Sequence, residues 1–293
     1  MTPTPAEPCR VSAYVPCFNN ASTIGLAIRA VQNQTHPVDE LFVVDDGSTD
    51  NSAAVVEGHG VRVIRMGKNQ GRGAVRAQAM EAARNEFVLC CDATNEIAAT
   101  FLEGGLTWFS RERVLAIFGR CYDRRAKTTI DRWRARHLFK QDIPQEADFR
   151  GKLSTFGAIV RKSAVQRAGN YNPLLRQGED FDLGFRLLAM GDVVADPTLH
   201  IQPVVHNTLF QVMERFARWN RASITDYNLS EFLESHIVAW RILIPRDVRQ
   251  KDWLAALISA TMPYFSLAYA DKRSFGFSRK PNLEKASPLP PKP

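Results

Sequence analysis

The chain has 293 residues, 45% apolar and 24% charged, which is enough for one large domain or two small ones with a sizeable core. Its five cysteines include no CxxC pair, which argues against a disulfide framework and against a zinc site. The formal charge of +7 is concentrated in residues 111–140 and in the tail from Asp271. Two basic segments favour an anionic ligand or membrane surface over nucleic acid, with solvated basic faces as the plain alternative.

The first 120 residues alternate short apolar segments with helical patterns. Strands are predicted over 11–15, 41–44, 61–66 and 87–91, and helices around 24–31 and over 73–85. Apolar strands separated by helices predict a parallel sheet that is covered on both faces. Ligands of such sheets bind at the carboxyl ends of the strands, so we expect functional residues directly after the first, second and fourth strands.

The pattern of apolar and polar residues is less regular in the rest of the chain. Residues 120–150 are basic and polar with little periodicity, and they are predicted to form a loop or insertion. A strand is expected at 156–160, a helix at 181–190, and helices beyond Leu209. We expect disorder over 1–9 and in the Pro-rich segment 273–293. The N-terminal segment lacks the apolar core of a secretory signal, so a cytoplasmic location is expected.

Five short motifs carry the candidate chemistry. They are PCFNN (16–20), DDGSTDNS (45–52), KNQGRGAVRAQA (68–79), CDATNE (91–96) and GEDFDLG (178–184). Adjacent carboxylates at the end of a buried strand repel each other unless they contact a ligand, a cation or backbone N–H groups. For each motif taken separately, an ordinary role in a turn or a helix cap explains the residues about as well as a ligand-binding role does. Lys68, Arg72 and Arg76 are candidates to face an anion, although no GxGxxG or Walker spacing is present.

The order of these motifs along residues 10–220 resembles that of the family 2 glycosyltransferases. The resemblance implies an α/β fold of GT-A type, with a mostly parallel sheet flanked by helices and a helical C-terminal extension. It also implies transfer of a sugar, with inversion, from a nucleotide-diphosphate sugar to an acceptor hydroxyl, in envelope or surface polysaccharide assembly. The expected domain spans 10–222, with a nucleotide-binding half (10–120) and an acceptor half (121–222), followed by helices over 223–272.

The same resemblance implies roles for individual residues. Asp180 matches the catalytic base, with Glu179 as the second candidate. The residues implied to bind the nucleotide-sugar are Pro16, Asn19, Asp45, Asp46, Arg76 and Asp92. His206 matches a residue near the diphosphate, and Arg215, Arg218 and Trp219 in RFARW form a helix facing donor or acceptor.

One departure from the family pattern concerns the metal. The family usually has DADD where this chain has Asp92-Ala93-Thr94-Asn95, so Thr94 replaces the acid that binds Mg²⁺ or Mn²⁺. A neutral hydroxyl is a poor ligand for a hard cation. Asp92 and His206 with the diphosphate remain as metal ligands, or basic side chains replace the metal, or activity is lost. The last possibility defines the alternative function, a noncatalytic nucleotide-sugar-binding protein.

Residues 253–270 contain no charge and fall just short of the ~20 residues that span a bilayer. Pro263 and three hydroxyl residues weaken a spanning interpretation, whereas Trp253, Tyr264 and Tyr269 suit a membrane interface. The two readings are a core-packed helix pair and a peripheral contact with the inner face of the membrane, which suits a glycan or lipid-linked acceptor.

Overall fold

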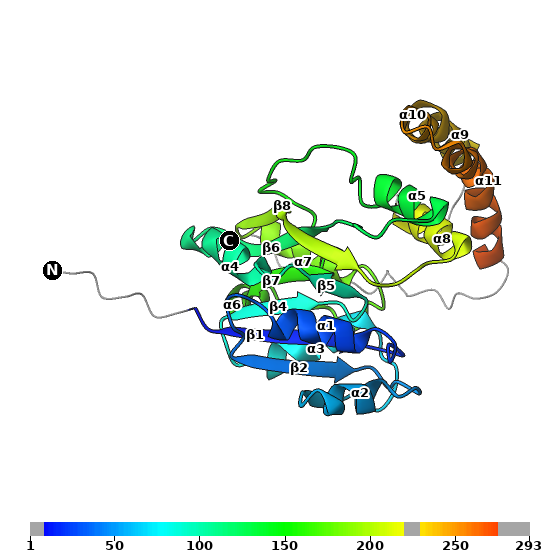
Figure 1. Cartoon of the computed structure of the whole chain (residues 1–293). Helices are drawn as coiled ribbons and strands as arrows, with labels where there is room; N and C mark the ends of the chain where they lie inside the picture. The colour runs from blue at the N-terminus through cyan, green and yellow to red at the C-terminus, as the bar shows by residue number, and fades with distance from the viewer. Residues whose placement is uncertain (1–8, 220–228, 275–293) are drawn as a thin grey trace. The chain divides into compact units, whose positions relative to one another are not determined.

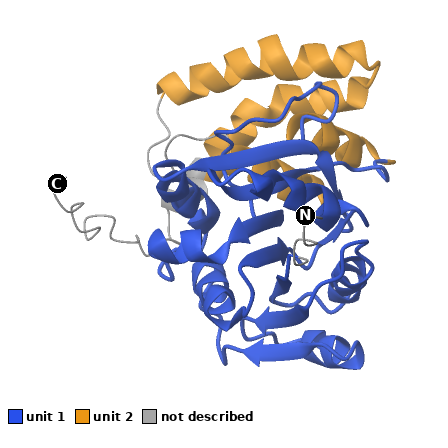
Figure 2. Cartoon of the chain, turned by 90° about the vertical axis from the view of Figure 1, so that its left-hand side faces the viewer, with its two compact units in different colours: residues 1–126, 139–206 blue, residues 127–138, 207–293 orange. Residues whose placement is uncertain are grey.

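The computed structural model describes residues 9–219 and 229–274, and most of the two expected disordered ends lies outside these residues. The chain divides into two compact units (Figure 2). The first comprises the chain up to Ala126 and Phe139–His206, and the second comprises Lys127–Leu138 and the chain from Asn207 onward. The expected domain boundary at residue 222 lies outside the described residues and stays a prediction.

The first unit is built on one mixed eight-stranded sheet with the order β3-β2-β1-β4-β7-β6-β8-β5. The strands are β1 (Val11–Cys17), β2 (Glu40–Asp45), β3 (Arg62–Arg65), β4 (Phe87–Cys91), β5 (Asn95–Ile97), β6 (Val114–Cys121), β7 (Gly157–Arg161) and β8 (Asp192–Pro203). The first four in spatial order are parallel, β6 pairs with β8 in parallel, and the other three pairings are antiparallel. The expected parallel arrangement of the first four strands is thus confirmed within a sheet that is mixed as a whole.

Helices cover both faces of this sheet because successive side chains of each strand point to opposite faces (Figure 1). In β1, Ala13 and Val15 pack in one core cluster, whereas Tyr14 belongs to the other. The first cluster contains side chains of α1 (Ile24–Gln32), α2 (Ser52–Gly58), α4 (Phe101–Leu106) and the 3-10 turn Thr107–Ser110. The second contains side chains of α3 (Arg72–Ala82), α6 (Lys162–Arg167) and α7 (Glu179–Leu188).

The second unit is helical. Its helices are α5 (Thr129–His137), α8 (Leu209–Trp219), α9 (Leu229–Val238), a π-helical segment (Ala239–Leu243), α10 (Ile244–Arg249) and α11 (Trp253–Ser274). No helix in the described part of the chain combines the length and the hydropathy that a membrane crossing requires. These helices confirm the prediction that the C-terminal part is helical.

The reading of 120–150 as a loop is wrong over α5. Thr128 caps this helix in a capping box with Asp131, and Trp133 is fully buried among residues of α8 and α11. The indole Nε1 of Trp133 donates a hydrogen bond of 2.9 Å to Ser259 Oγ. The basic composition concealed the helix because its arginines are partnered within the unit: Arg132 and Arg136 pair with Asp252, and Arg136 also with Asp247.

Candidate functional site

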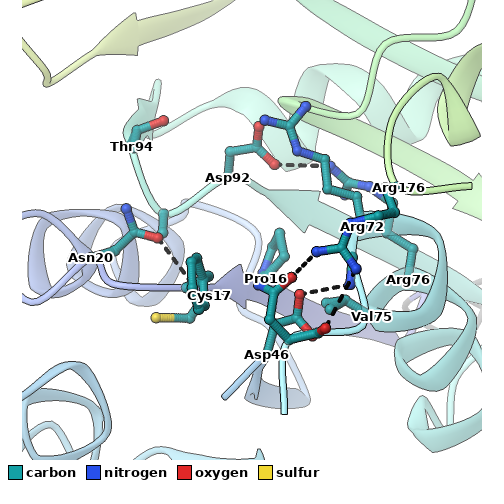
Figure 3. A pocket seen from close by; sticks show the side chains of 14 residues that line it. Pro16, Cys17, Asn20, Asp46, Arg72, Val75, Arg76, Asp92, Thr94 and Arg176 are labelled. Carbon is teal, nitrogen blue, oxygen red and sulfur yellow. Dashed lines mark hydrogen bonds and ion pairs between the residues drawn. The ribbon is translucent and has the colours of Figure 1, made fainter. Parts of the chain in front are cut away.

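A cavity of about 430 Å³ in the first unit lies at the carboxyl ends of β1 and β4 and at the start of α3 (Figure 3). Its wall gathers residues from four of the five motifs, which are far apart in the sequence, and none from GEDFDLG (178–184). The predicted site residues on this wall are Pro16, Asp46, Arg76, Asp92 and Thr94. The residues that follow the first, second and fourth strands therefore meet at one cavity.

Asp46 holds the glycine-rich loop against the end of β2. Its two carboxylate oxygens accept hydrogen bonds from the backbone N–H groups of Gln70 (2.7 Å) and Gly71 (2.9 Å), and the residue is only 4% exposed. Gly71 has a φ of +97°, and a Cβ there would lie 3.0 Å from Cγ of Arg176. Backbone N–H donors thus offset part of the mutual repulsion between the two adjacent acids at the end of β2.

Asp45 and Asn19 lie outside the cavity wall and hold the turn that follows β2. Asp45 Oδ1 accepts a hydrogen bond of 3.2 Å from the backbone N–H of Ser48 and a second one from its hydroxyl. Asn19 has a φ of +54°, and its Oδ1 accepts a hydrogen bond of 2.8 Å from the N–H of Thr49. Neither residue lies on the cavity wall, and both fix the DDGST turn.

Arg76 joins the cavity to α7. Its Nη2 lies 3.0 Å from Asp92 Oδ1, and its Nε lies 2.9 Å from Glu179 Oε1. Nη1 also donates to Tyr14 Oη (3.3 Å) and Cys90 Sγ (2.7 Å). The side chain is 3% exposed, so a single buried guanidinium holds two carboxylates from different motifs.

The electrostatics of this network keep Arg76 charged. Burial alone lowers the pKa of Arg76, but the neighbouring groups of Cys90, Tyr14, Asp92 and Glu179 raise it well above its usual value. Burial raises the pKa of the Cys90 thiol to about 11, so this group is a neutral hydrogen-bonding partner at physiological pH. The carboxylates of Asp92 and Glu179 are therefore the anionic partners of Arg76.

Asp180 and Glu179 differ sharply in their surroundings. Glu179 is 2% exposed, and its Oε2 has no hydrogen-bond partner among the described residues, while Oε1 is held by Arg76. Asp180 is half-buried, and the hydroxyl of Thr155 donates to its Oδ2 at 3.5 Å. Neither residue lies on the cavity wall itself. Of the two, only Asp180 keeps solvent access and is free of an ion pair within the described chain.

The residues at the cavity do not fit an ordinary divalent-metal site. Thr94 lies on the wall near Asp92, and Asp92 is already paired with Arg76 (Figure 3). Within 9–219 and 229–274, no group of three His, Cys, Asp or Glu side chains is arranged to hold a metal ion. His206 is exposed and does not line the cavity.

The residues of the RFARW motif belong to α8 of the second unit. Arg218 Nε pairs with Glu214 Oε1 at 3.1 Å, and the guanidinium of Arg215 lies 5.9 Å from the centre of the Trp219 ring. The cavity wall consists of first-unit residues, and the role predicted for this motif on the donor or acceptor side stays a prediction.

A model of the family described as "Glycosyl transferase family 2" matches residues 12–171, which is more than half of the chain. The chain belongs to glycosyl transferase family 2. Among curated proteins it is similar to the succinoglycan biosynthesis protein ExoU of Rhizobium meliloti, with 28% identity over 64% of this chain and 59% of that protein. It is also similar to the putative glycosyltransferase EpsH of Bacillus subtilis, with 32% identity over 60% of this chain and 55% of that protein. The match thus spans little more than half the length of these relatives.

Solved structures of glycosyltransferases share the GT-A fold of this family 2 chain. The crystal structure of S. aureus TarS 1–349 has a TM-score of 0.54 and 17% identity, and covers 92% of this chain and 93% of that one. The mannosyltransferase PcManGT from Pyrobaculum calidifontis, in complex with GDP-Man and Mn²⁺, has a TM-score of 0.53 and 16% identity over 92% of this chain and 79% of that one. At these identities the likeness concerns the fold.

Two residues of the cavity wall were not among the residues predicted from the sequence. Arg176 and Asn69 line it, and the Arg176 guanidinium donates to Asn69 Oδ1. Gly73 permits this arrangement because a Cβ there would lie 2.1 Å from the carbonyl oxygen of Asn172. The available signal was the pair of glycines in QGRG, since two glycines flanking an arginine indicate a close backbone approach.

Proposed function

We propose that this chain is an inverting glycosyltransferase that uses a nucleotide-diphosphate sugar, in the assembly of an envelope or surface polysaccharide. The observation that carries the proposal is the buried ion-pair chain Asp92–Arg76–Glu179, which links the cavity wall to the residue before Asp180. The family assignment supports transferase chemistry, and the curated relatives named above support polysaccharide assembly.

In the proposed reaction, Asp180 accepts the proton of an acceptor hydroxyl as its oxygen attacks the sugar C1. The bond from C1 to the diphosphate oxygen breaks on the opposite side, and its electron pair leaves with the diphosphate. Asp180 suits the base because it is half-buried and not ion-paired within the described chain, whereas Glu179 is held by Arg76. Glu179 then acts as a positioning residue for the start of α7.

The donor is proposed to occupy the 430 Å³ cavity. Pro16 and Asp46 lie at the carboxyl ends of β1 and β2, where nucleotides bind to open α/β sheets. Asn19 and Asp45 hold the turn beside it. TarS has a crystal structure in complex with UDP-GlcNAc, and PcManGT one with GDP-Man, so the same fold accepts either base.

Metal use is proposed to be weak or dispensable. Thr94 occupies the position of the usual acid, and Asp92 and His206 do not share the cavity wall. The rival function, a noncatalytic nucleotide-sugar-binding protein, draws on the same observation. The rival keeps donor binding without turnover, so a rate measurement separates the two.

Peripheral membrane contact is proposed for the second unit, which would bring the enzyme to a lipid-linked acceptor. Four side chains of its C-terminal helices are about two-thirds exposed: Trp240 (65%), Trp253 (66%), Leu254 (65%) and Leu257 (63%). Exposed cations accompany them, namely Arg241, Arg249 and Lys251. Exposed tryptophans and leucines beside basic residues are typical of helices that lie in a bilayer interface.

A donor screen tests the proposed function. The full chain is incubated with a panel of UDP-, GDP- and dTDP-sugars, with EDTA and with Mn²⁺, and release of the nucleoside diphosphate is followed. We expect turnover with one donor or a few related ones. Binding of a donor without release of nucleotide under any condition or acceptor mixture would favour the noncatalytic alternative.

A further inference from the structure

The donor cavity contains two arginines that the transfer chemistry described above does not use. Arg72 and Arg176 both line it and both are exposed. Neither makes an ion pair with a carboxylate in the described chain, whereas Arg76 on the same wall is paired with two. Arg176 is oriented by its hydrogen bonds to Asn69, and Arg72 is the first residue of α3. Figure 3 shows both arginines among the side chains that line the cavity.

The charged side chains of the cavity wall differ in whether they have a partner of opposite charge. Its ionised side chains are the cations Arg72, Arg76 and Arg176 and the anions Asp46 and Asp92. Asp46 accepts hydrogen bonds from the backbone N–H groups of Gln70 and Gly71, and Asp92 pairs with Arg76, so neither acid is paired with Arg72 or Arg176. Two guanidinium groups that pair with no carboxylate in the described chain therefore face a cavity in which Thr94 stands where the family pattern has an acid. The positive end of the α3 dipole lies at the same wall and adds to this potential.

We infer that Arg72 and Arg176 bind the diphosphate of the donor and take over the charge compensation that a divalent metal supplies in an acidic site. The inference rests on the proposed function, because it names the groups that meet the leaving diphosphate. When the bond from C1 breaks, the diphosphate gains one negative charge. Preorganised cations aimed at this developing charge stabilise the transition state, and no metal ion is needed for this effect. Guanidinium groups suit the task because their planar fork binds phosphate oxygens in pairs.

Calorimetric titration of UDP and GDP tests this directly, in EDTA and in Mn²⁺ at low ionic strength, with the full chain. We expect the better nucleotide to bind in EDTA with an affinity close to that in Mn²⁺. Arg72→Gln and Arg176→Gln should each weaken binding in EDTA about tenfold or more, because a hydrogen bond to a charged group contributes roughly 1.5–3 kcal/mol. Arg72→Lys should recover part of the loss. Arg113→Gln is the matched control, since Arg113 is a 76% exposed arginine of the same unit outside the cavity wall.

Thr94→Asp supplies a second readout. It restores a carboxylate opposite the arginines, so nucleotide binding should become weaker in EDTA and gain a dependence on Mn²⁺ that the natural chain lacks. Nucleotide affinity that collapses in EDTA for the natural chain, with Arg72→Gln and Arg176→Gln no different from the control, would overturn the inference while leaving the proposed function intact. Absence of UDP and GDP binding in both conditions would overturn the proposed function, and the inference with it.

Discussion

At the scale of single residues, Arg76 is the most constrained side chain of the cavity. It is 3% exposed and bridges Asp92 and Glu179, of which Glu179 is also buried. A buried pair contributes little net stability relative to an apolar replacement of both partners, but removal of one partner leaves the other charge buried and unpaired.

We therefore expect Arg76→Met to lower the free energy of unfolding by about 3–5 kcal/mol, measured by urea denaturation. Arg65→Met is the control, because Arg65 is 59% exposed and its pair with Glu57 lies at the surface, where such pairs contribute at most about 1 kcal/mol. Equal, small losses in the two variants would show that Glu179 is readily neutralised or solvated without Arg76.

Asp46 supports a second prediction at this scale. Asp46→Ala removes the acceptors of two backbone hydrogen bonds and frees the loop at Gln70 and Gly71. Nucleotide affinity measured by calorimetry should fall about tenfold or more, whereas Glu57→Gln at a 56% exposed position should leave it unchanged. An unaltered affinity in Asp46→Ala would place the nucleotide elsewhere.

The candidate site was predictable from sequence where residues follow strands directly. Pro16, Asp46 and Asp92 fall on the cavity wall because the carboxyl ends of parallel strands converge. Arg176 was not predictable in this way, since its position depends on a loop that packs against Gly71 and Gly73 from 100 or so residues further along the chain. The buried ion pairs of Arg76 likewise depend on long-range packing that no local pattern encodes.

At the scale of elements, α5 shows why composition misleads. Its basic residues resemble a solvated segment, but Arg136 and His137 turn inward to Asp247, a fully buried carboxylate of α10. The edge strand β5 and the long strand β8 also escaped prediction, because β5 has only three residues and β8 contains Asp196, Pro197 and His200. Elements whose polar residues find partners far along the chain carry weak periodic signals.

The His137–Asp247 pair predicts a pH dependence of stability. Burial lowers the pKa of His137, and its Nδ1 has no hydrogen-bond partner in the described structure, while Nε2 lies 2.7 Å from Asp247 Oδ1. Because the folded pKa is below the unfolded value of about 6.5, this contribution is complete above that pH and is lost as the pH falls below it. The pKa of Asp247 is lowered as well: burial acts to raise it, but hydrogen bonds from His137, Ser259 and Arg136 outweigh that effect. Its contribution is lost only at more acidic pH.

Thermal melts at pH 7.5 and 5.5 check this expectation. The natural chain should lose up to about 1.4 kcal/mol of stability at pH 5.5 through His137. His137→Gln should be less stable at pH 7.5 but should respond less to acidification over the same window. A pH response identical in the two proteins would assign the titration to other groups.

At the scale of the whole molecule, the parallel half of the sheet and the helical C-terminal part follow from apolar periodicity. The division into units does not, because the second unit combines Lys127–Leu138 with the chain from Asn207 onward. A helix of the second unit is thus encoded within the sequence of the first. Only the packing reveals this, because Trp133 contributes to the core of the C-terminal helices.

The proposed membrane contact is a property of the second unit. Sedimentation with anionic vesicles at low salt should recover the full chain in the pellet, and release it at high salt as the basic residues are screened. A variant with Trp253→Gln and Leu257→Gln, both at exposed positions, should stay in the supernatant. Leu174→Gln, at an 84% exposed position of the first unit, is the control. A full chain that remains soluble with these vesicles would remove the support for a membrane-bound acceptor.

The central claim is that Asp180 is the general base of a glycosyl transfer, and single-turnover transfer by Asp180→Asn tests it most directly, with the donor found in the screen. We predict unchanged donor affinity and a rate lower by about 10²–10⁴-fold, the usual contribution of a general base. Asp182→Asn, two residues further along α7 and 37% exposed, should transfer at the natural rate. Transfer by Asp180→Asn at a rate near that of the natural chain would contradict the account.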